Sequence, residues 1–137
     1  MIRLRAFSAS ARLAAAIVIV FAVGVGRSQE MKSVKAGVYT AEQADRGIAL
    51  FKNKCASCHA PNRFTDDLFY TSFAGKPMWE MFDVISDTMP EEDPGGMKPE
   101  EYADVIAYLI KLNGFPAGAT DLPTSKEALS VILFEKP

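Results

Sequence analysis

The chain's two cysteines and its one histidine all stand within a single five-residue stretch, Cys55-Ala56-Ser57-Cys58-His59. Two cysteines at this spacing can each add to a different vinyl group of one porphyrin. The adjacent histidine is then held beneath the iron as the proximal ligand. This C-x-x-C-H pattern predicts covalent attachment of one haem c through Cys55 and Cys58, with His59 as an iron ligand.

Two other chemistries use the same residue types. A structural zinc site needs four ligands, and the motif supplies only three, so carboxylates or a partner chain would have to complete it. A redox-active C-x-x-C pair normally stands at a helix N-terminus near a βαβ pattern, whereas this motif follows a predicted helix. A simple disulfide in an exported protein is the third alternative. The motif and its context favour haem over all three.

The second axial ligand of such a haem cannot be imidazole, because His59 is the only histidine. Methionine is the other common choice in cytochromes c, and it raises the reduction potential. We predict Met89, because Pro90 keeps it out of helical dihedrals and on a stiff support. The other methionines considered are less suitable. Met78 and Met81 lie in the inward stripe of a predicted helix, where methionine is usually core filler. Met31 lies in the flexible lead, and Met97 follows two glycines, which make a mobile support.

The elements that must position these residues are helices. The apolar spacing of Ala44, Ile48 and Phe51, after a capping box from Thr40 to Gln43, predicts a helix over residues 41–54. Further helices are expected around residues 68–74, from Pro77 to Thr88, and from Pro99 to an Asn113-Gly114 cap. We expect the run from Val131 to Phe134 to lie as a strap on the core. No alternation long enough for a sheet is found, so the predicted fold class is all-α.

The N-terminal segment, residues 1–28, resembles a secretory signal, with basic residues ahead of the apolar run 13–25. That run is short for a bilayer span, although an uncleaved membrane anchor is the alternative. We therefore predict an exported, periplasmic protein, attached to the membrane only if this segment is retained.

Charge argues against nucleic acid as a partner. Four of the 15 Lys and Arg lie in the segment 1–28 and none of the 17 acids does, so the remainder has 11 basic and 17 acidic side chains. A strongly acidic domain repels the phosphate backbone.

The chain resembles the class I c-type cytochromes, in particular small bacterial periplasmic monohaem cytochromes and the cytochrome domains that accompany quinoprotein dehydrogenases. The resemblance rests on Gly47 and Phe51, the C-x-x-C-H motif, Thr88-Met89-Pro90, the stretch from Glu101 to Leu109, and the stretch from Asn113 to Gly118. It implies a cytochrome c fold, in which the N- and C-terminal helices cross with Gly47 and Phe51 against Tyr108. The expected organisation is a signal peptide over residues 1–28, a flexible lead over 29–39, a cytochrome c domain over 40–118 and a packed tail over 119–137.

The expected function is one-electron transfer, with Fe(II)/Fe(III) cycling between His59 and Met89, rather than enzymatic catalysis. The expected partners are redox proteins, a periplasmic dehydrogenase as donor and an oxidase or another cytochrome as acceptor. One alternative is a cytochrome subunit that works inside a larger dehydrogenase complex, with residues 119–137 as an interface strap. The other is a haem sensor or peroxidase with an open sixth site.

Overall fold

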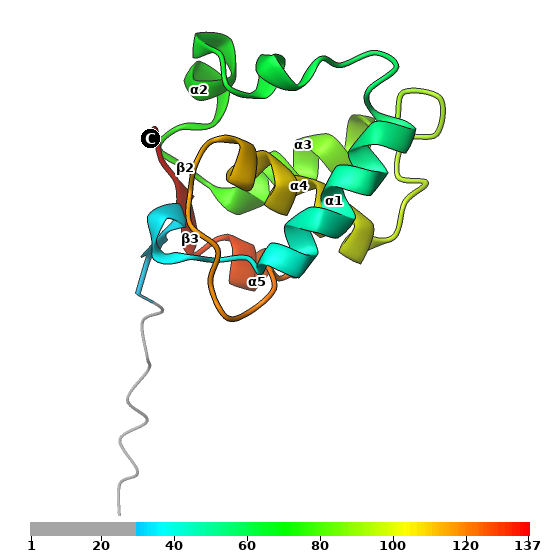
Figure 1. The fold of residues 1–137 in the computed structure, drawn as a ribbon. Helices are drawn as coiled ribbons and strands as arrows, with labels where there is room; N and C mark the ends of the chain where they lie inside the picture. The colour runs from blue at the N-terminus through cyan, green and yellow to red at the C-terminus, as the bar shows by residue number, and fades with distance from the viewer. Residues whose placement is uncertain (1–29) are drawn as a thin grey trace, which may run out of the picture.

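The computed structural model describes residues 30–137 (Figure 1). The predicted signal peptide or anchor, residues 1–28, lies outside this part of the chain. Within the described residues no helix has both the length and the apolar character that crossing a membrane requires.

Two long helices form the centre of the fold. Helix α1 (Ala41–Lys54) begins at Thr40, whose Oγ1 accepts a hydrogen bond from Gln43 N over 3.1 Å. Helix α4 (Pro99–Leu112) begins with proline, where the missing N–H costs nothing, and is followed by Asn113 and by Gly114 at φ 80°. Both helices have the bounds that the sequence predicts.

Helix α1 crosses α4 (Figure 1), and the close approach of the two helices depends on Gly47. A Cβ built on Gly47 would lie 1.9 Å from the carbonyl oxygen of Asp104 and 3.0 Å from the Cβ of Tyr108. One turn further along, the rings of Phe51 and Tyr108 meet edge to face, with centroids 5.2 Å apart. The helix contact implied by the resemblance is therefore confirmed, and any side chain at position 47 would force the two backbones apart.

The segment between these helices forms a 3-10 helix η2 (Pro61–Phe64), helix α2 (Asp67–Phe73) and helix α3 (Met78–Thr88), with a short strand between the last two. Met78 and Met81, expected as core filler on the inward stripe of this helix, are buried together with Phe82, whereas Ile85 on the same stripe is half-buried. Pro77 precedes this helix as its N-cap and is not its first residue. Helix α3 ends before Met89, which is extended at φ −129° and ψ 150°, as expected for a residue before proline.

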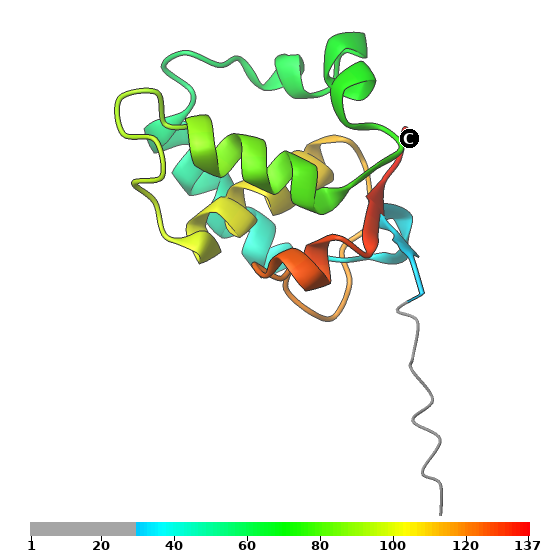
Figure 2. The ribbon, with the colours of Figure 1, turned by 180° about the vertical axis from the view of Figure 1, so that it is seen from behind.

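A small three-stranded sheet, which the sequence analysis does not predict, joins the two ends of the described chain. Strand β3 (Ile132–Phe134) lies between β1 (Lys32–Ser33), which is parallel to it, and β2 (Lys76–Pro77), which is antiparallel. Strands of two or three residues are too short to show alternation in a sequence. From behind, β3 is seen beside the N-terminal segment (Figure 2).

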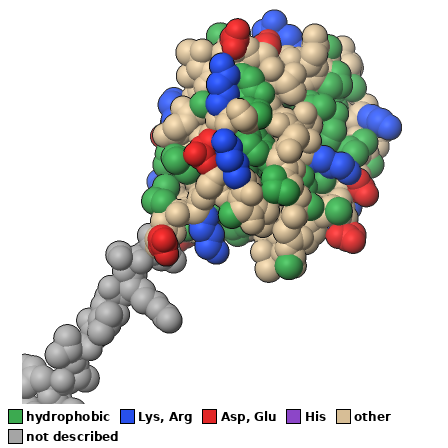
Figure 3. Space-filling view, turned by 60° about the vertical axis from the view of Figure 1, so that its left-hand side comes forward, with side chains coloured by type: hydrophobic (Ala, Val, Ile, Leu, Met, Phe, Trp, Pro, Cys, Tyr) green, Lys and Arg blue, Asp and Glu red, His purple; other side chains and the backbone are tan. Residues whose placement is uncertain are grey.

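The predicted flexible lead is packed against the domain instead. Residues 34–36 form a 3-10 helix, η1 (Val34–Ala36), and Val34, Val38 and Tyr39 are buried. The hydroxyl of Tyr39 donates to the carbonyl of Phe115 over 2.7 Å. On the face shown in Figure 3, basic, acidic and apolar side chains are interspersed.

The tail after residue 118 also packs on the domain. Its buried residues are Leu122, Leu129, Ile132 and Phe134. Helix α5 (Lys126–Leu129) is capped by Ser125, whose Oγ accepts a hydrogen bond from Ala128 N over 3.3 Å.

Candidate haem site

A cavity open to solvent lies between the C-terminal end of α1, α2, α3 and one face of α4. Four predicted site residues, Cys55, Cys58, His59 and Met89, line this one cavity. They come from two segments that are distant in sequence, one directly after α1 and the other directly after α3. The remaining lining is Phe51, Lys54, Phe64, Phe69, Phe73, Val84, Ile85, Thr88, Pro90, Glu91, Glu92, Val105 and Leu109.

The end of α1 shapes the C-x-x-C-H segment. Cys55 N donates to Phe51 O over 2.9 Å, which continues the helical bonding by one residue. The carbonyl of Cys55 then accepts from Cys58 N over 3.1 Å and from His59 N over 2.9 Å. These bonds fold the motif into a tight turn that brings both sulfurs and the imidazole to the same cavity.

The two thiols lie in different surroundings. Cys55 is half-buried and Cys58 is exposed, and no disulfide joins them. Burial raises the pKa of the Cys55 thiol, the negative charge of Glu92 raises it further, and Lys54 opposes both effects. Both cysteines are thus free to form bonds to a group in the cavity.

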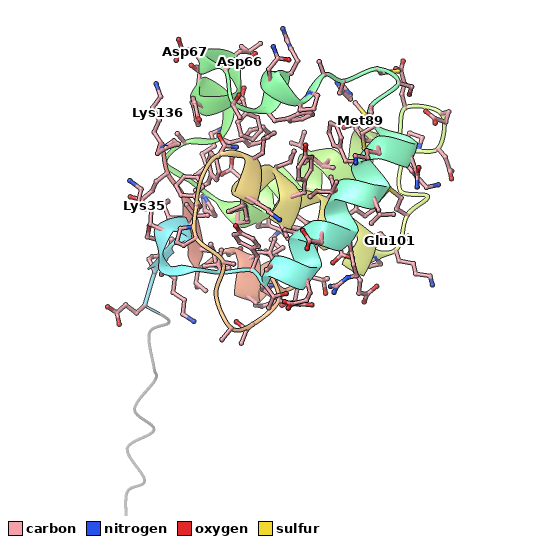
Figure 4. The ribbon with its side chains drawn as sticks, in the orientation of Figure 1. Lys35, Asp66, Asp67, Met89, Glu101 and Lys136 are labelled. Atoms are coloured by element: carbon pink, nitrogen blue, oxygen red, sulfur yellow. The ribbon has the colours of Figure 1, made fainter. Side chains whose placement is uncertain are left out.

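The positions of the methionines show which of them could serve as an iron ligand in this cavity. Met89 lines the cavity beside the end of α1 (Figure 4). Met78 and Met81 are almost fully buried in the core, and Met97 is buried beyond the cavity, whereas Met31 is 51% exposed in the N-terminal segment. Among the methionines of the described residues, Met89 is the one that shares the cavity with His59.

The loop that carries Met89 consists of two consecutive turns. Asp93 N donates to Pro90 O over 2.9 Å, and Gly96 N donates to Asp93 O over 3.0 Å. Met97, at the far end of the loop, is buried. The two glycines before Met97 therefore do not make this part of the loop a mobile support, contrary to the expectation from the sequence.

Tyr102, on the first turns of α4, contacts both ends of this loop. Its hydroxyl donates to Met89 O over 2.7 Å and accepts from Met97 N over 3.4 Å. This role of Tyr102 is not predicted from the sequence. A buried tyrosine needs a polar partner for its hydroxyl, so the sequence indicates that Tyr102 has such a partner. The spacing of apolar residues does not identify which residue that partner is.

Asn113 holds the opposite wall of the cavity. Its Nδ2 donates to Phe64 O over 2.9 Å, and its Oδ1 accepts from the hydroxyl of Tyr70 over 2.6 Å. The ring of Phe64 meets the rings of His59 and Phe51 edge to face at 5.7 and 5.5 Å between centroids. Asn113 therefore does more than cap α4, because it also fixes the segment that follows His59.

The donor set fits a haem and does not fit zinc. The cavity wall is formed mainly by aromatic and aliphatic side chains, which suit a large apolar macrocycle. Two free thiols, one imidazole and one thioether sulfur lie on it, the set that thioether attachment and His/Met ligation use. In residues 30–137 no group of three or more Cys, His, Asp and Glu side chains could hold a metal ion.

The charged residues of the cavity stand at its mouth. Lys54, Glu91 and Glu92 are exposed lining residues, and Val84, which also lines the cavity, is 50% exposed. One edge of a group bound in the cavity is therefore accessible from solvent through an acidic rim.

Comparison with known proteins agrees with this site. Residues 42–109 match the family model described as "Cytochrome C oxidase, cbb3-type, subunit III". This segment is a c-type cytochrome domain, with the mostly helical fold expected from the sequence and with covalently bound haem c as its cofactor. Among curated proteins and solved structures none matches the chain.

Proposed function

We propose that the protein is an exported monohaem cytochrome that carries single electrons in a periplasmic respiratory or dehydrogenase-linked chain. The haem would be bonded to Cys55 and Cys58, with His59 and Met89 as axial ligands. The observation that carries this proposal is that two segments, far apart in sequence, contribute sulfur and imidazole groups to one apolar cavity.

The chain's own residues hold, shield and orient the cofactor. When bound, the haem supplies a one-electron Fe(II)/Fe(III) couple. Phe51, Phe64 and Leu109 exclude water from the cavity, and the neutral thioether of Met89 favours the reduced state relative to a second imidazole. The exposed lining residues Val84 and Glu92 leave the cavity accessible, so that a partner can approach without opening the fold.

A methionine series tests the ligand assignment. Met89→Ala is expected to abolish the sulfur-to-iron charge-transfer absorption of the oxidised protein and to lower its reduction potential, because water or an added ligand replaces the thioether. Met97→Leu is the matched control, since Met97 is buried away from the cavity and leucine preserves the packing. A Met89→Ala protein that keeps both the absorption and the potential of the wild type would overturn the assignment.

Carbon monoxide distinguishes a carrier from an open-site sensor or peroxidase. A six-coordinate reduced protein should bind it slowly and weakly, whereas an open sixth site binds it rapidly without denaturant. The single histidine also leaves the distal side without the imidazole that such enzymes often use.

The second candidate function is that of a subunit in a larger complex. The matching family model is described as an oxidase subunit, so the complex could be an oxidase as well as a dehydrogenase. The tail from residue 119, however, buries its apolar side chains on its own domain, which supports a self-contained carrier. Carrier contacts of this kind are small and transient. Stable co-purification with a larger subunit would favour the complex, whereas isolation as a monomer would favour the carrier.

Export and covalent attachment are tested together by a haem-stained denaturing gel of a periplasmic extract. We expect a stained band at the mass of the chain without its predicted signal peptide. A stained band confined to the membrane fraction at full mass would indicate an uncleaved anchor, and a band in the cytosol alone would contradict export.

A further inference from the structure

The hydroxyl of Tyr102 bridges the two ends of the loop that carries Met89. It donates to the Met89 carbonyl over 2.7 Å and receives a hydrogen bond from Met97 N over 3.4 Å. Tyr102 is only 3% exposed, so its hydroxyl is largely shielded from bulk water. A single side chain from another element thus defines where the loop leaves α3 and where it enters α4.

The support beneath this hydroxyl is rigid. Tyr102 belongs to α4, the helix whose Val105 and Leu109 line the cavity. Its ring packs edge to face on Phe82 of α3, with centroids 6.2 Å apart. The hydroxyl is therefore fixed relative both to the cavity wall and to the helix that ends just before Met89.

The loop has few other anchors. Its two turn hydrogen bonds, from Asp93 to Pro90 and from Gly96 to Asp93, lie within the loop and do not tie it to the domain. At the start of the loop, Met89 N donates to Ile85 O over 3.0 Å, which continues the bonding of α3 by one residue. Residues 91–96 are exposed. In the described part of the chain, Tyr102 is the one side chain outside residues 89–97 that hydrogen-bonds to them. The next residue, Lys98, donates its N–H to Glu101 Oε2 over 2.8 Å.

We propose that Tyr102 is a positioning residue that, by holding the Met89 carbonyl, keeps the Met89 side chain in the cavity and resists its displacement. The inference rests on the proposed function, in which Met89 is the sixth ligand. Displacing that ligand requires the loop to move, and the loop cannot move far without breaking the bond between Tyr102 and Met89 O. The Tyr102 hydroxyl therefore favours the closed state, in which Met89 lies in the cavity, over an open state in which the loop has moved and Met89 is displaced.

Imidazole competition measures this bias. Tyr102→Phe keeps the ring and removes only the hydroxyl. A hydrogen bond of ordinary net strength corresponds to roughly a threefold to tenfold change in an equilibrium. The open fraction should rise by that factor, so the apparent Kd for imidazole on the oxidised protein should fall threefold to tenfold. The sulfur-to-iron absorption should also be lost at lower imidazole concentration and at lower temperature than in the wild type.

Tyr108→Phe is the matched control. It makes the same substitution on the same helix, but Tyr108 packs on Phe51 and does not line the cavity. Its imidazole affinity should equal that of the wild type. Both titrations are run below the onset of unfolding, as followed by far-ultraviolet circular dichroism, so that a general loss of stability does not enter the comparison.

The outcomes separate the inference from the proposed function. If Tyr102→Phe binds imidazole as weakly as the wild type while Met89→Ala loses the sulfur absorption, the role of Tyr102 is wrong and the ligand assignment stands. An equal gain in affinity in Tyr102→Phe and Tyr108→Phe would also overturn the inference. If Met89→Ala retains the absorption, the ligand assignment itself fails.

Discussion

The side-chain amide of Gln43 pairs with the backbone of Leu122, 79 positions further along the chain. Leu122 N donates to Gln43 Oε1 over 2.6 Å, and Gln43 Nε2 donates to Leu122 O over 3.2 Å. Gln43 therefore acts as a backbone-like partner that attaches the C-terminal tail to the start of α1. The capping box predicted for this helix is only half formed, because Thr40 caps Gln43 N while the glutamine side chain turns to the tail.

Gln43→Met tests this attachment. The substitution preserves the volume but leaves two buried backbone groups of Leu122 without partners. We expect a loss of about 2–4 kcal/mol in the free energy of unfolding, measured by urea denaturation. Glu42→Met introduces the same side chain one position earlier on the exposed face, and its effect should stay within about 0.5 kcal/mol. Equal stability of the two variants would show that the tail is held by apolar burial alone.

Gly47→Ala tests the close crossing of α1 and α4. Helix propensity alone would favour alanine here by about 1 kcal/mol. The added Cβ would lie 1.9 Å from the Asp104 carbonyl oxygen, so the helices must separate. We expect a net destabilisation of about 1–3 kcal/mol or more, measured as a lower urea midpoint.

The exposed Ala49 of the same helix provides the reference for that variant. Ala49→Gly should destabilise by about 1 kcal/mol, through helix propensity without a clash. A Gly47→Ala protein that is more stable than the wild type would mean that the helices can separate without cost, contrary to the packing described.

We expect Asp121 to make part of the free energy of unfolding depend on pH in the acid range. A hydrogen bond from the Thr40 hydroxyl and an ion pair with Arg46 lower the pKa of this carboxyl below its ordinary value of 3.8. A lowered folded-state pKa means that the stabilisation is present above the ordinary value and is lost as the pH falls through the folded-state value. Because Asp121 is half-exposed, the contribution should be under about 1 kcal/mol.

Thermal unfolding at about pH 5 and about pH 2.5 checks this dependence. Asp121→Asn should lose less stability over that interval than the wild type. The difference should shrink in high salt, which screens exposed pairs. Identical losses in the two proteins would exclude Asp121 as a source of the acid sensitivity.

The acidic rim at the cavity mouth predicts charge-selective electron transfer. Replacing Glu91 and Glu92 with glutamine should slow reduction or oxidation by a small cationic metal complex and speed it by an anionic one. We expect changes of roughly twofold to fivefold at low ionic strength that vanish at high salt. Stopped-flow absorbance measures the rates. A Glu42→Gln/Glu127→Gln protein carries the same change in net charge away from the rim, and an equal response from it would show that only net charge matters.

Local signals in the sequence determined the helices and the attachment motif. The bounds of α1 follow from Thr40 and the apolar spacing of Ala44 and Phe51, and those of α4 follow from Pro99 and Gly114. These features act over one or two helical turns, where hydrogen bonding and side-chain spacing are set by neighbours in the chain. The resemblance to c-type cytochromes added the contact of Gly47 and Phe51 with Tyr108, which spacing by itself does not imply.

Tertiary structure alone decided which groups the polar side chains bond to and how the N-terminal lead and the C-terminal tail pack on the domain. Tyr102 reaches Met89, Asn113 reaches Phe64, and Gln43 reaches Leu122, each across a gap in sequence that no periodic pattern records. The lead is packed rather than flexible because Val34 and Tyr39 find apolar surface that only the folded tail and α4 supply. A hydroxyl or amide can satisfy its hydrogen bonds with any backbone group in reach, so its identity predicts that it has a partner, and only the packed chain determines which one.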